Sequence, residues 1–222
     1  LSFIDGKVYA KCFQLTFFGE TKKFYKINKK LNFDLFKAKV LLIRNEPPFN
    51  QQYINTTFIL EHLAKKVKII NHPKSIREVP EKLFSIRLVK YMPSTLISEN
   101  LEEIKEFFKT NKKVIVKPIN SYSGNEVLLL NGFNSKIITR YIKKHNHIIF
   151  QKFLPKISNG DKRVFIINGK VKGSIARVPK RGSILSNMSK GAVAEISKLT
   201  KPEIKISKQV AILLKQQNIY FA

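Results

Sequence analysis

The chain has 222 residues, of which 43% are hydrophobic, and its formal net charge is +27. This length suffices for one large domain or two small ones with a buried core, and no apolar run approaches the roughly 18 residues that a membrane helix needs. The single cysteine, Cys12, excludes an internal disulfide framework and suits a reducing compartment. We therefore expect a cytoplasmic protein with no membrane partner.

The positive charge is spread along the chain, and no run of Lys or Arg is longer than two residues. It accompanies abundant Asn, Ile and Phe, whose codons are rich in A and T, so a nucleotide-biased genome explains all of these residue types together. Nucleic-acid binding explains only the lysines. We expect no nucleic-acid partner, and a basic nucleic-acid-binding protein remains an alternative that the charge alone supports.

Hydrophobic patterning predicts short alternating elements in the first third of the chain. In chain order these are a hairpin over 1–18 that turns at Asp5-Gly6, a loop with a short helix over 20–37, a strand over 40–43, a helix over about 52–66 and a strand over 68–70. On that helix we expect Phe58, Ile59 and Leu63 to lie on one side.

The rest of the chain also mixes helix and strand patterns. In chain order we expect a short helix over 81–88, a strand over 95–97, a helix that begins after Asn100, strands over 114–116 and 126–130, a helix over 135–144, a strand over 148–153, a hairpin over 164–176 that turns at Asn168-Gly169, a loop over 179–200, a helix over 201–217 and the opening of a buried strand over 218–222. Asn100 and Glu103 form a capping-box pattern at the start of their helix. The order predicts a mixed α/β (α+β) fold with a domain boundary near 73–80.

Cationic groups recur at the ends of short apolar strands between Val114 and Pro179. They occur in Val116-Lys117-Pro118, in Gln151-Lys152-Phe153-Leu154, in Gly160-Asp161-Lys162-Arg163 and in Ala176-Arg177. Strands hold side chains rigidly, and an enzyme that handles phosphate needs its cations fixed before the substrate binds. This ordered set is the most informative functional pattern in the sequence.

Together with two earlier stretches, this set resembles the ATP-grasp ligases, and within them the prokaryotic glutathione synthetases. The earlier stretches are Leu42–Phe49 with Tyr53, and Asn71–Arg77 with Glu81–Phe84. The resemblance implies an ATP-grasp fold, with residues 1–75 as a partial pre-ATP-grasp (amino-terminal substrate) domain and residues 76–222 as the ATP-grasp domain. It implies ATP-dependent ligation of γ-glutamylcysteine and glycine through an acyl-phosphate, with Mg²⁺ or Mn²⁺ as the metal and a homo-oligomer, commonly a tetramer.

The resemblance also implies which residues bind ATP: Lys82, Lys117, Gly124, Gln151, Lys152, Phe153, Leu154 and Asp161. Each lysine could alternatively be one of many solvated lysines, although a lysine that ends an apolar strand before Pro118 is poorly placed for mere solubility. The Gln151–Leu154 segment could alternatively be a plain core strand. Asp161 is expected near the ribose and phosphate side of the nucleotide.

Arg163 and Arg177 match the arginines that contact the acyl-phosphate and the tetrahedral intermediate in this family. They lie on the two arms of the predicted hairpin, where two guanidinium groups can grip phosphate oxygens bidentately. Because two converging arginines repel each other unless an anion lies between them, we expect an anion site here. The alternative is that they are surface arginines paired with acids.

Arg44 and Asn187 match substrate-binding positions, and Arg44 could alternatively cap the end of its strand. The sequence departs from the family in two loops: the stretch after Lys117-Pro118 has one glycine, Gly124, and residues 180–195 have only Gly182 and Gly191. We expect the family's metal ligands beyond Ala222 and none within this chain, so that the chain is a fragment with little activity by itself. Another ATP-grasp carboxylate-amine ligase and a non-catalytic remnant remain open alternatives.

Overall fold

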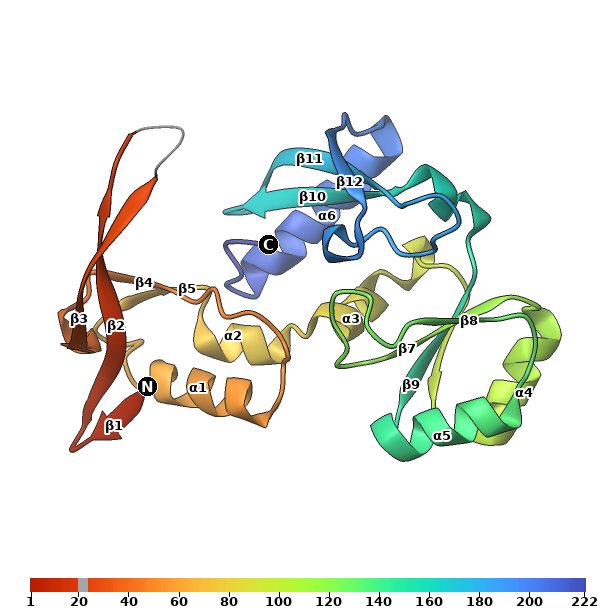
Figure 1. The fold of residues 1–222 in the computed structure, drawn as a ribbon, viewed down its shortest axis with the longest axis horizontal. Coiled ribbons are helices and arrows are strands. Elements are labelled where there is room, and N and C mark those ends of the chain that lie inside the picture. The colour runs from red at the N-terminus through yellow and green to blue at the C-terminus, as the bar shows by residue number, and fades with distance from the viewer. Residues whose placement is uncertain (20–23) are drawn as a thin grey trace. The chain divides into compact units, whose positions relative to one another are not determined.

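The computed structural model describes residues 1–19 and 24–222, and the chain divides into two compact units, Leu1–Glu78 and Val79–Ala222 (Figure 1). The part of the predicted loop at residues 20–23 lies outside the described residues. Within the described ranges, no helix has the length and apolarity to cross a membrane.

The first unit contains an antiparallel sheet and a small parallel sheet with two helices. Its elements are β1 (Ser2–Ile4), β2 (Lys7–Phe17), β3 (Tyr25–Asp34), β4 (Val40–Leu42), α1 (Gln51–Glu61), β5 (Lys68–Ile70) and α2 (Pro73–Glu78). Strands β1, β2 and β3 pair antiparallel in that order, and β4 pairs parallel with β5. The core gathers around Val8, Leu60 and Leu63, all nearly inaccessible to solvent. The predicted amino-terminal hairpin is confirmed, with Asp5 and Gly6 at its turn.

Two predictions for this unit are wrong. Residues 25–34, predicted as part of a loop, form the strand β3, because pairing with β2 organises a lysine-rich segment that has no clear alternation of its own. Helix α1, predicted to run to about residue 66, ends at Glu61, and Phe58, predicted on the same side as Leu63, is 57% exposed whereas Leu63 is fully buried. Arg77 of α2 covers that ring at 3.9 Å and donates to Thr57 Oγ1 (3.1 Å) and to Glu61, and these contacts join α2 to α1.

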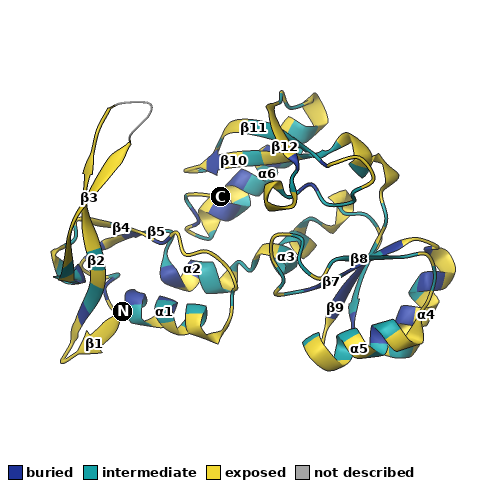
Figure 2. Cartoon of the chain, viewed as in Figure 1, coloured by how far each residue is buried: buried dark blue, intermediate teal, exposed yellow. Residues whose placement is uncertain are grey.

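The second unit begins with a four-stranded antiparallel sheet. Its elements are α3 (Glu81–Phe84), a 3₁₀ segment (Ser85–Tyr91), β6 (Thr95–Ser98), α4 (Leu101–Thr110), β7 (Val114–Pro118), β8 (Leu128–Leu130), α5 (Ser135–His145) and β9 (Ile148–Lys152), with the strand order β6-β9-β7-β8. Ile104 and Phe108 of α4 and Ile138 of α5 pack against the apolar residues of β7 and β9, which are the most buried strands in Figure 2. Each strand and helix predicted for this region is present, but the helix predicted over 81–88 is α-helical only to Phe84 and continues as the 3₁₀ segment, and the strand predicted over 126–130 begins at Leu128.

The capping box before α4 contains an additional residue. Asn100 Oδ1 accepts from the backbone N–H of Glu102 and Glu103, as predicted. The Glu103 carboxylate, however, accepts from Ser98 Oγ (2.6 Å), and this hydroxyl in turn accepts from the Asn100 N–H (2.9 Å). The cap is therefore closed through the buried Ser98.

The second part of this unit is a three-stranded antiparallel sheet packed on a long helix. Its elements are β10 (Asp161–Ile167), β11 (Lys170–Val178), β12 (Val193–Ile196) and α6 (Lys201–Gln216). The Asn168-Gly169 hairpin is confirmed. Residues 193–196, predicted as loop, add β12 to β11. The last residues run beside β10, where Ala222 N donates to Ile166 O (3.0 Å) and Phe221 forms a bridge with Ile167.

Candidate functional site

Strand β7 places Lys117 at the end of a rigid element. Along β7 the side chains of Val114, Val116 and Pro118 are buried under the helices, and Lys117 alternates to the other face. Its ammonium donates to Gln151 Oε1 of β9 (3.0 Å), and Gln151 Nε2 donates to Thr95 Oγ1 of β6 (2.8 Å). Three strands therefore fix the position of this ammonium. Sequence reasoning gave Thr95 no role, because its contact with Gln151 exists only once β6 and β9 pair.

Lys82 reaches the segment that follows β7. It projects from α3, and its ammonium donates to the carbonyl oxygens of Ile119 (3.0 Å) and Ser121. Ser121 belongs to the stretch 120–126, which we call the phosphate loop, and Ile119 directly precedes it. Lys82 thus anchors this loop next to Lys117.

The two ammonium groups lie in an environment that disfavours positive charge. Burial lowers the pKa of Lys117, the nearby charge of Lys82 lowers it further, and Glu81 opposes these effects. Burial likewise lowers the pKa of Lys82, again opposed by Glu81. In the part of the chain that the structure describes, neither lysine forms an ion pair. Such a pair is complementary to a ligand with several negative charges, such as a triphosphate.

Gly124 of the phosphate loop lies against residues 179–200, which we call the lid loop. Its φ is +71°, and a Cβ at this position would lie 2.7 Å from Asn187 Oδ1 and 3.3 Å from a methyl carbon of Leu185. Glycine therefore permits both the backbone conformation and the close approach of the two loops. The structure thus brings together Gly124 and Asn187, two of the residues that the sequence pointed to.

The Gln151–Leu154 segment uses most of its backbone donors within the protein. The N–H groups of Lys152 and Phe153 donate to the carbonyls of Ser94 and Lys113, both at 2.9 Å. Leu154, whose side chain is 53% exposed, follows directly. The N–H groups of Lys152 and Phe153 are therefore not free to face a planar ring edge, and the Leu154 carbonyl accepts from the Ile157 N–H (3.1 Å).

Arg177 is paired with an acid. Its Nε and Nη2 donate to the two carboxylate oxygens of Asp161 at 2.7 and 2.6 Å, across the β10–β11 pair. Arg163 lies opposite Ile175, and its exposed side chain forms no ion pair or hydrogen bond within the described ranges. The anion that we expected between the two arginines is thus supplied for Arg177 by Asp161, whose carboxylate we had expected beside the ribose.

Arg44 belongs to the first unit. It follows Ile43, whose buried backbone N–H donates to Ile70 O at 2.7 Å, and it precedes the cis Pro47-Pro48 bond. Burial raises the pKa of the nearby Tyr53 hydroxyl, and the positive charge of Arg44 acts in the opposite direction. Arg44 is therefore an exposed cation at the end of a fixed strand, next to a half-buried phenol.

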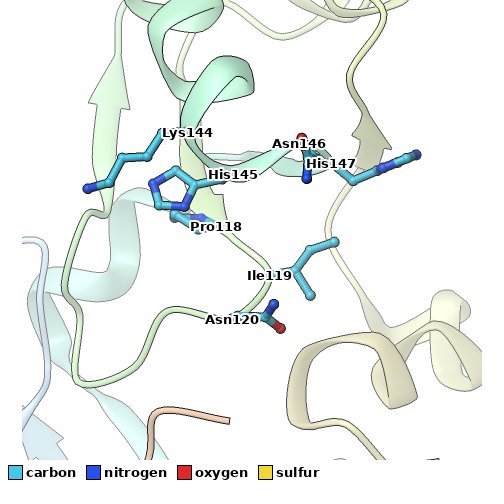
Figure 3. A pocket seen from close by; sticks show the side chains of 7 residues that line it. All are labelled: Pro118, Ile119, Asn120, Lys144, His145, Asn146 and His147. Carbon is cyan, nitrogen blue, oxygen red and sulfur yellow. The ribbon is translucent and has the colours of Figure 1, made fainter. Parts of the chain in front are cut away.

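A hollow of about 400 Å³ opens beside the start of the phosphate loop, at the end of α5 (Figure 3). It is lined by Pro118, Ile119, Asn120, Lys144, His145, Asn146 and His147. Its basic side chains already have acidic neighbours, because Lys144 pairs with Glu126 and His147 Nδ1 lies 3.5 Å from Glu99 Oε2. The hollow is therefore less suited to an anion than Lys82 and Lys117.

The described residues contain no group of three or more His, Cys, Asp or Glu side chains arranged to hold a metal ion. We consequently assign no metal ligand to any of them.

Comparison with known families decides the relationship. Residues 1–77 match the model of the prokaryotic glutathione synthetase N-terminal domain, and residues 81–222 match that of the prokaryotic glutathione synthetase ATP-grasp domain. The chain belongs to the prokaryotic glutathione synthetase family. It is 32% identical over 222 residues to a glutathione synthetase of Mesorhizobium japonicum. The alignment covers 98% of this chain and 71% of that protein. It is 33% identical over 229 residues to a glutathione synthetase of Anaplasma centrale, with coverage of 100% and 71%.

Solved structures confirm the ATP-grasp fold of this family member. D-cycloserine synthetase DcsG superimposes with a TM-score of 0.65 at 11% identity, over 85% of this chain and 69% of that one. The ATP-grasp ligase PsnB, solved with a precursor variant, Mg and ADP, superimposes with a TM-score of 0.57 at 14% identity. That match covers 94% of this chain and 71% of the PsnB chain. At these identities the likeness shows the fold alone.

Proposed function

We propose that this protein is a glutathione synthetase that uses ATP to join the carboxylate of γ-glutamylcysteine to the amine of glycine. The observation that carries the proposal is the pair of half-buried lysines, Lys82 and Lys117, which form no ion pair with any residue that the structure describes, in a chain that belongs to this family. Each carboxylate of the peptide is a poor electrophile, so a carboxylate oxygen must first take the γ-phosphoryl group of ATP, with release of ADP. The amine of glycine then displaces phosphate and loses a proton.

In this proposal the chain's cations hold the charge that builds up during both steps. Lys82 and Lys117 bind the phosphates of ATP, and Arg163 and Arg177 bind the acyl-phosphate and the tetrahedral intermediate. Gln151, Lys152, Phe153 and Leu154 lie along the adenine. Asn187 and Gly124, which are in contact here, close the lid loop over the phosphate loop and exclude water from the acyl-phosphate.

Arg44 is proposed to bind a carboxylate of γ-glutamylcysteine. Magnesium, or manganese in its place, supplies neutralisation of phosphate charge when bound. No metal ligand is assigned among residues 1–19 and 24–222.

We also propose a cytoplasmic homo-oligomer, a tetramer by resemblance to the family. The β2–β3 hairpin has an exposed apolar strip, on which Phe13, Phe17 and Ile27 are each more than half exposed. Such a strip supports the proposal that another subunit covers this surface. Light scattering of the purified protein measures the oligomeric state directly.

The test of the activity is ADP release by the full-length protein with Mg-ATP, γ-glutamylcysteine and glycine. We expect release only when both substrates are present. Release with γ-glutamylcysteine and other amines, but not glycine, would identify a different carboxylate-amine ligase. If the folded protein releases no ADP with any acceptor, it has the fold of the family without this catalytic activity.

A further inference from the structure

The Asp161–Arg177 contact occupies only part of the guanidinium group. Two of its five N–H bonds, on Nε and Nη2, donate to the carboxylate, which leaves three for another acceptor. The Arg177 side chain is 15% exposed and that of Asp161 is 36% exposed. The bidentate fork thus fixes the plane of the guanidinium without exhausting its donors.

An irregularity in the hairpin produces this contact. Next to the turn, Ile167 pairs with Lys170 and Ile166 with Val171. The next residue of β10, Phe165, pairs with Gly173 instead of Lys172, so Lys172 is the extra residue of a bulge in β11. Without this bulge Asp161 would lie opposite Ala176, and Arg177 would lie on the other face of the sheet. The bulge therefore places the carboxylate and the guanidinium side by side.

Gly160 makes the same contact possible from the other strand. Its φ is +92°, and a Cβ there would lie 2.6 Å from the carbonyl oxygen of Arg177. Any other residue at position 160 would push the start of β10 away from β11 where Asp161 pairs with Arg177. Two backbone features, the bulge and the glycine, thus converge on one ion pair.

This ion pair is not part of the packing between the sheet and α6. Lys162, the neighbour of Asp161, points to the opposite face and pairs with Glu203 of α6 (2.7 Å). Asp161 and Arg163 share the other face with Arg177 and Ile175. The carboxylate therefore acts on the face that carries both proposed catalytic arginines.

We infer that Asp161 is a positioning residue: it holds the Arg177 guanidinium in a fixed orientation for the acyl-phosphate and is not itself a nucleotide contact. The inference rests on the proposed function and assigns Asp161 a different role from the ribose contact expected from the sequence. A fixed cation needs no reorganisation when charge develops, whereas a loose arginine does.

The first arm of the test needs no turnover. Phenylglyoxal labels accessible guanidinium groups, and peptide mapping by mass spectrometry resolves each site. In Asp161→Asn we expect several-fold faster labelling of Arg177, with Arg163 labelled equally in both proteins as an internal control. Glu203→Gln, which breaks the neighbouring ion pair, should leave Arg177 labelling unchanged. Equal labelling of Arg177 in wild type and Asp161→Asn overturns the inference.

The second arm is kinetic. Asp161→Asn should lower kcat about tenfold or more while the KM for ATP changes less than about threefold, because the interaction matters in the transition state. The double variant with Arg177→Lys should be no slower than Arg177→Lys alone. A raised KM for ATP with unchanged kcat, or additive losses, would assign Asp161 to the nucleotide. Asp161→Glu, checked for folding by circular dichroism, is expected to fall between the wild type and Asp161→Asn. If the wild type shows no ADP release, the proposed function fails, and the labelling arm still decides the ion pair.

Discussion

The contacts of Lys117 favour ligand binding at the expense of stability. Its ammonium is partly desolvated and repelled by Lys82, so the folded state disfavours its charge. An anionic ligand reverses both effects at once. Charged residues that destabilise the folded state are common at functional sites, where the gain in ligand binding outweighs the loss of stability.

Replacing Lys117 with Met should therefore move affinity and stability in opposite directions. The affinity for Mg-ATP, measured by calorimetry, should fall about tenfold to hundredfold, because a hydrogen bond to a charged group contributes about 1.5–3 kcal/mol. The free energy of unfolding in urea at pH 7 should rise relative to the wild type. The exposed Lys112 provides a matched control, and Lys112→Met should change neither quantity.

The sign of the pH dependence follows from the lowered pKa of Lys117. Between that lowered value and the ordinary lysine value of 10.5, the unfolded chain binds more protons than the folded one. The wild type therefore gains stability from this group as pH rises through that window. The stability advantage of Lys117→Met should shrink from pH 7 toward pH 10, and an advantage that stays constant or widens would contradict the assignment.

At this scale the sequence predicted where a side chain lies along its strand or helix better than which residues it contacts. Lys117 was recognisable because it ends an apolar strand before a proline. The contacts of Lys82 with the Ile119 and Ser121 carbonyls join residues nearly forty positions apart, and no local pattern carries that information. The pairing of Arg177 with Asp161 depends on the bulge at Lys172, and a one-residue shift that changes the face of a side chain leaves no trace in the hydrophobic alternation.

At the scale of elements, the strands with a strong apolar pattern were predicted, and the two strands that were missed, β3 and β12, are largely exposed. β7 and β9 have buried cores that show in the sequence, whereas Tyr25–Lys30 of β3 and all of β12 are exposed and form by pairing with a neighbour. Helix α2 was missed because it is only six residues long. Its Arg77 binds Thr57 and Glu61, so tertiary contacts stabilise a segment too short to be helical alone.

The contact between the phosphate loop and the lid loop gives a prediction at this scale. Gly124→Ala places a methyl group 2.7 Å from Asn187 Oδ1 at a φ of +71°, whereas Gly182→Ala, at a φ of +79°, meets nothing within 4 Å. Both variants should lose about 1 kcal/mol through backbone strain. Only Gly124→Ala should also displace the lid loop, which limited trypsin digestion at Lys190 would detect as faster cleavage. Equal cleavage of the two variants would show that the loops do not hold each other in solution.

For the whole molecule, the few acids are a guide to which cations are structural. The chain has 15 acidic residues against 42 lysines and arginines. Several of these acids form specific contacts, such as Glu61 with Arg77, Asp161 with Arg177 and Glu203 with Lys162. The large excess of lysines is left without compensation, which suits the compositional origin inferred from the sequence and also guarantees some attraction for any polyanion.

The attraction for polyanions gives a prediction that distinguishes a ligase from a nucleic-acid-binding protein. A dispersed charge predicts oligonucleotide binding that weakens steeply with salt, by a factor of about a thousand or more between about 50 and 200 mM if six or more phosphates are contacted. Because this binding would use lysines over the whole surface, Lys117→Met should leave the affinity for the oligonucleotide and its salt slope unchanged while the affinity for Mg-ATP falls. Fluorescence anisotropy with a labelled oligonucleotide measures both. If Lys117→Met weakened oligonucleotide binding as much as ATP binding, or if ATP displaced the oligonucleotide stoichiometrically, the two ligands would share one site and nucleic acid would become the better candidate.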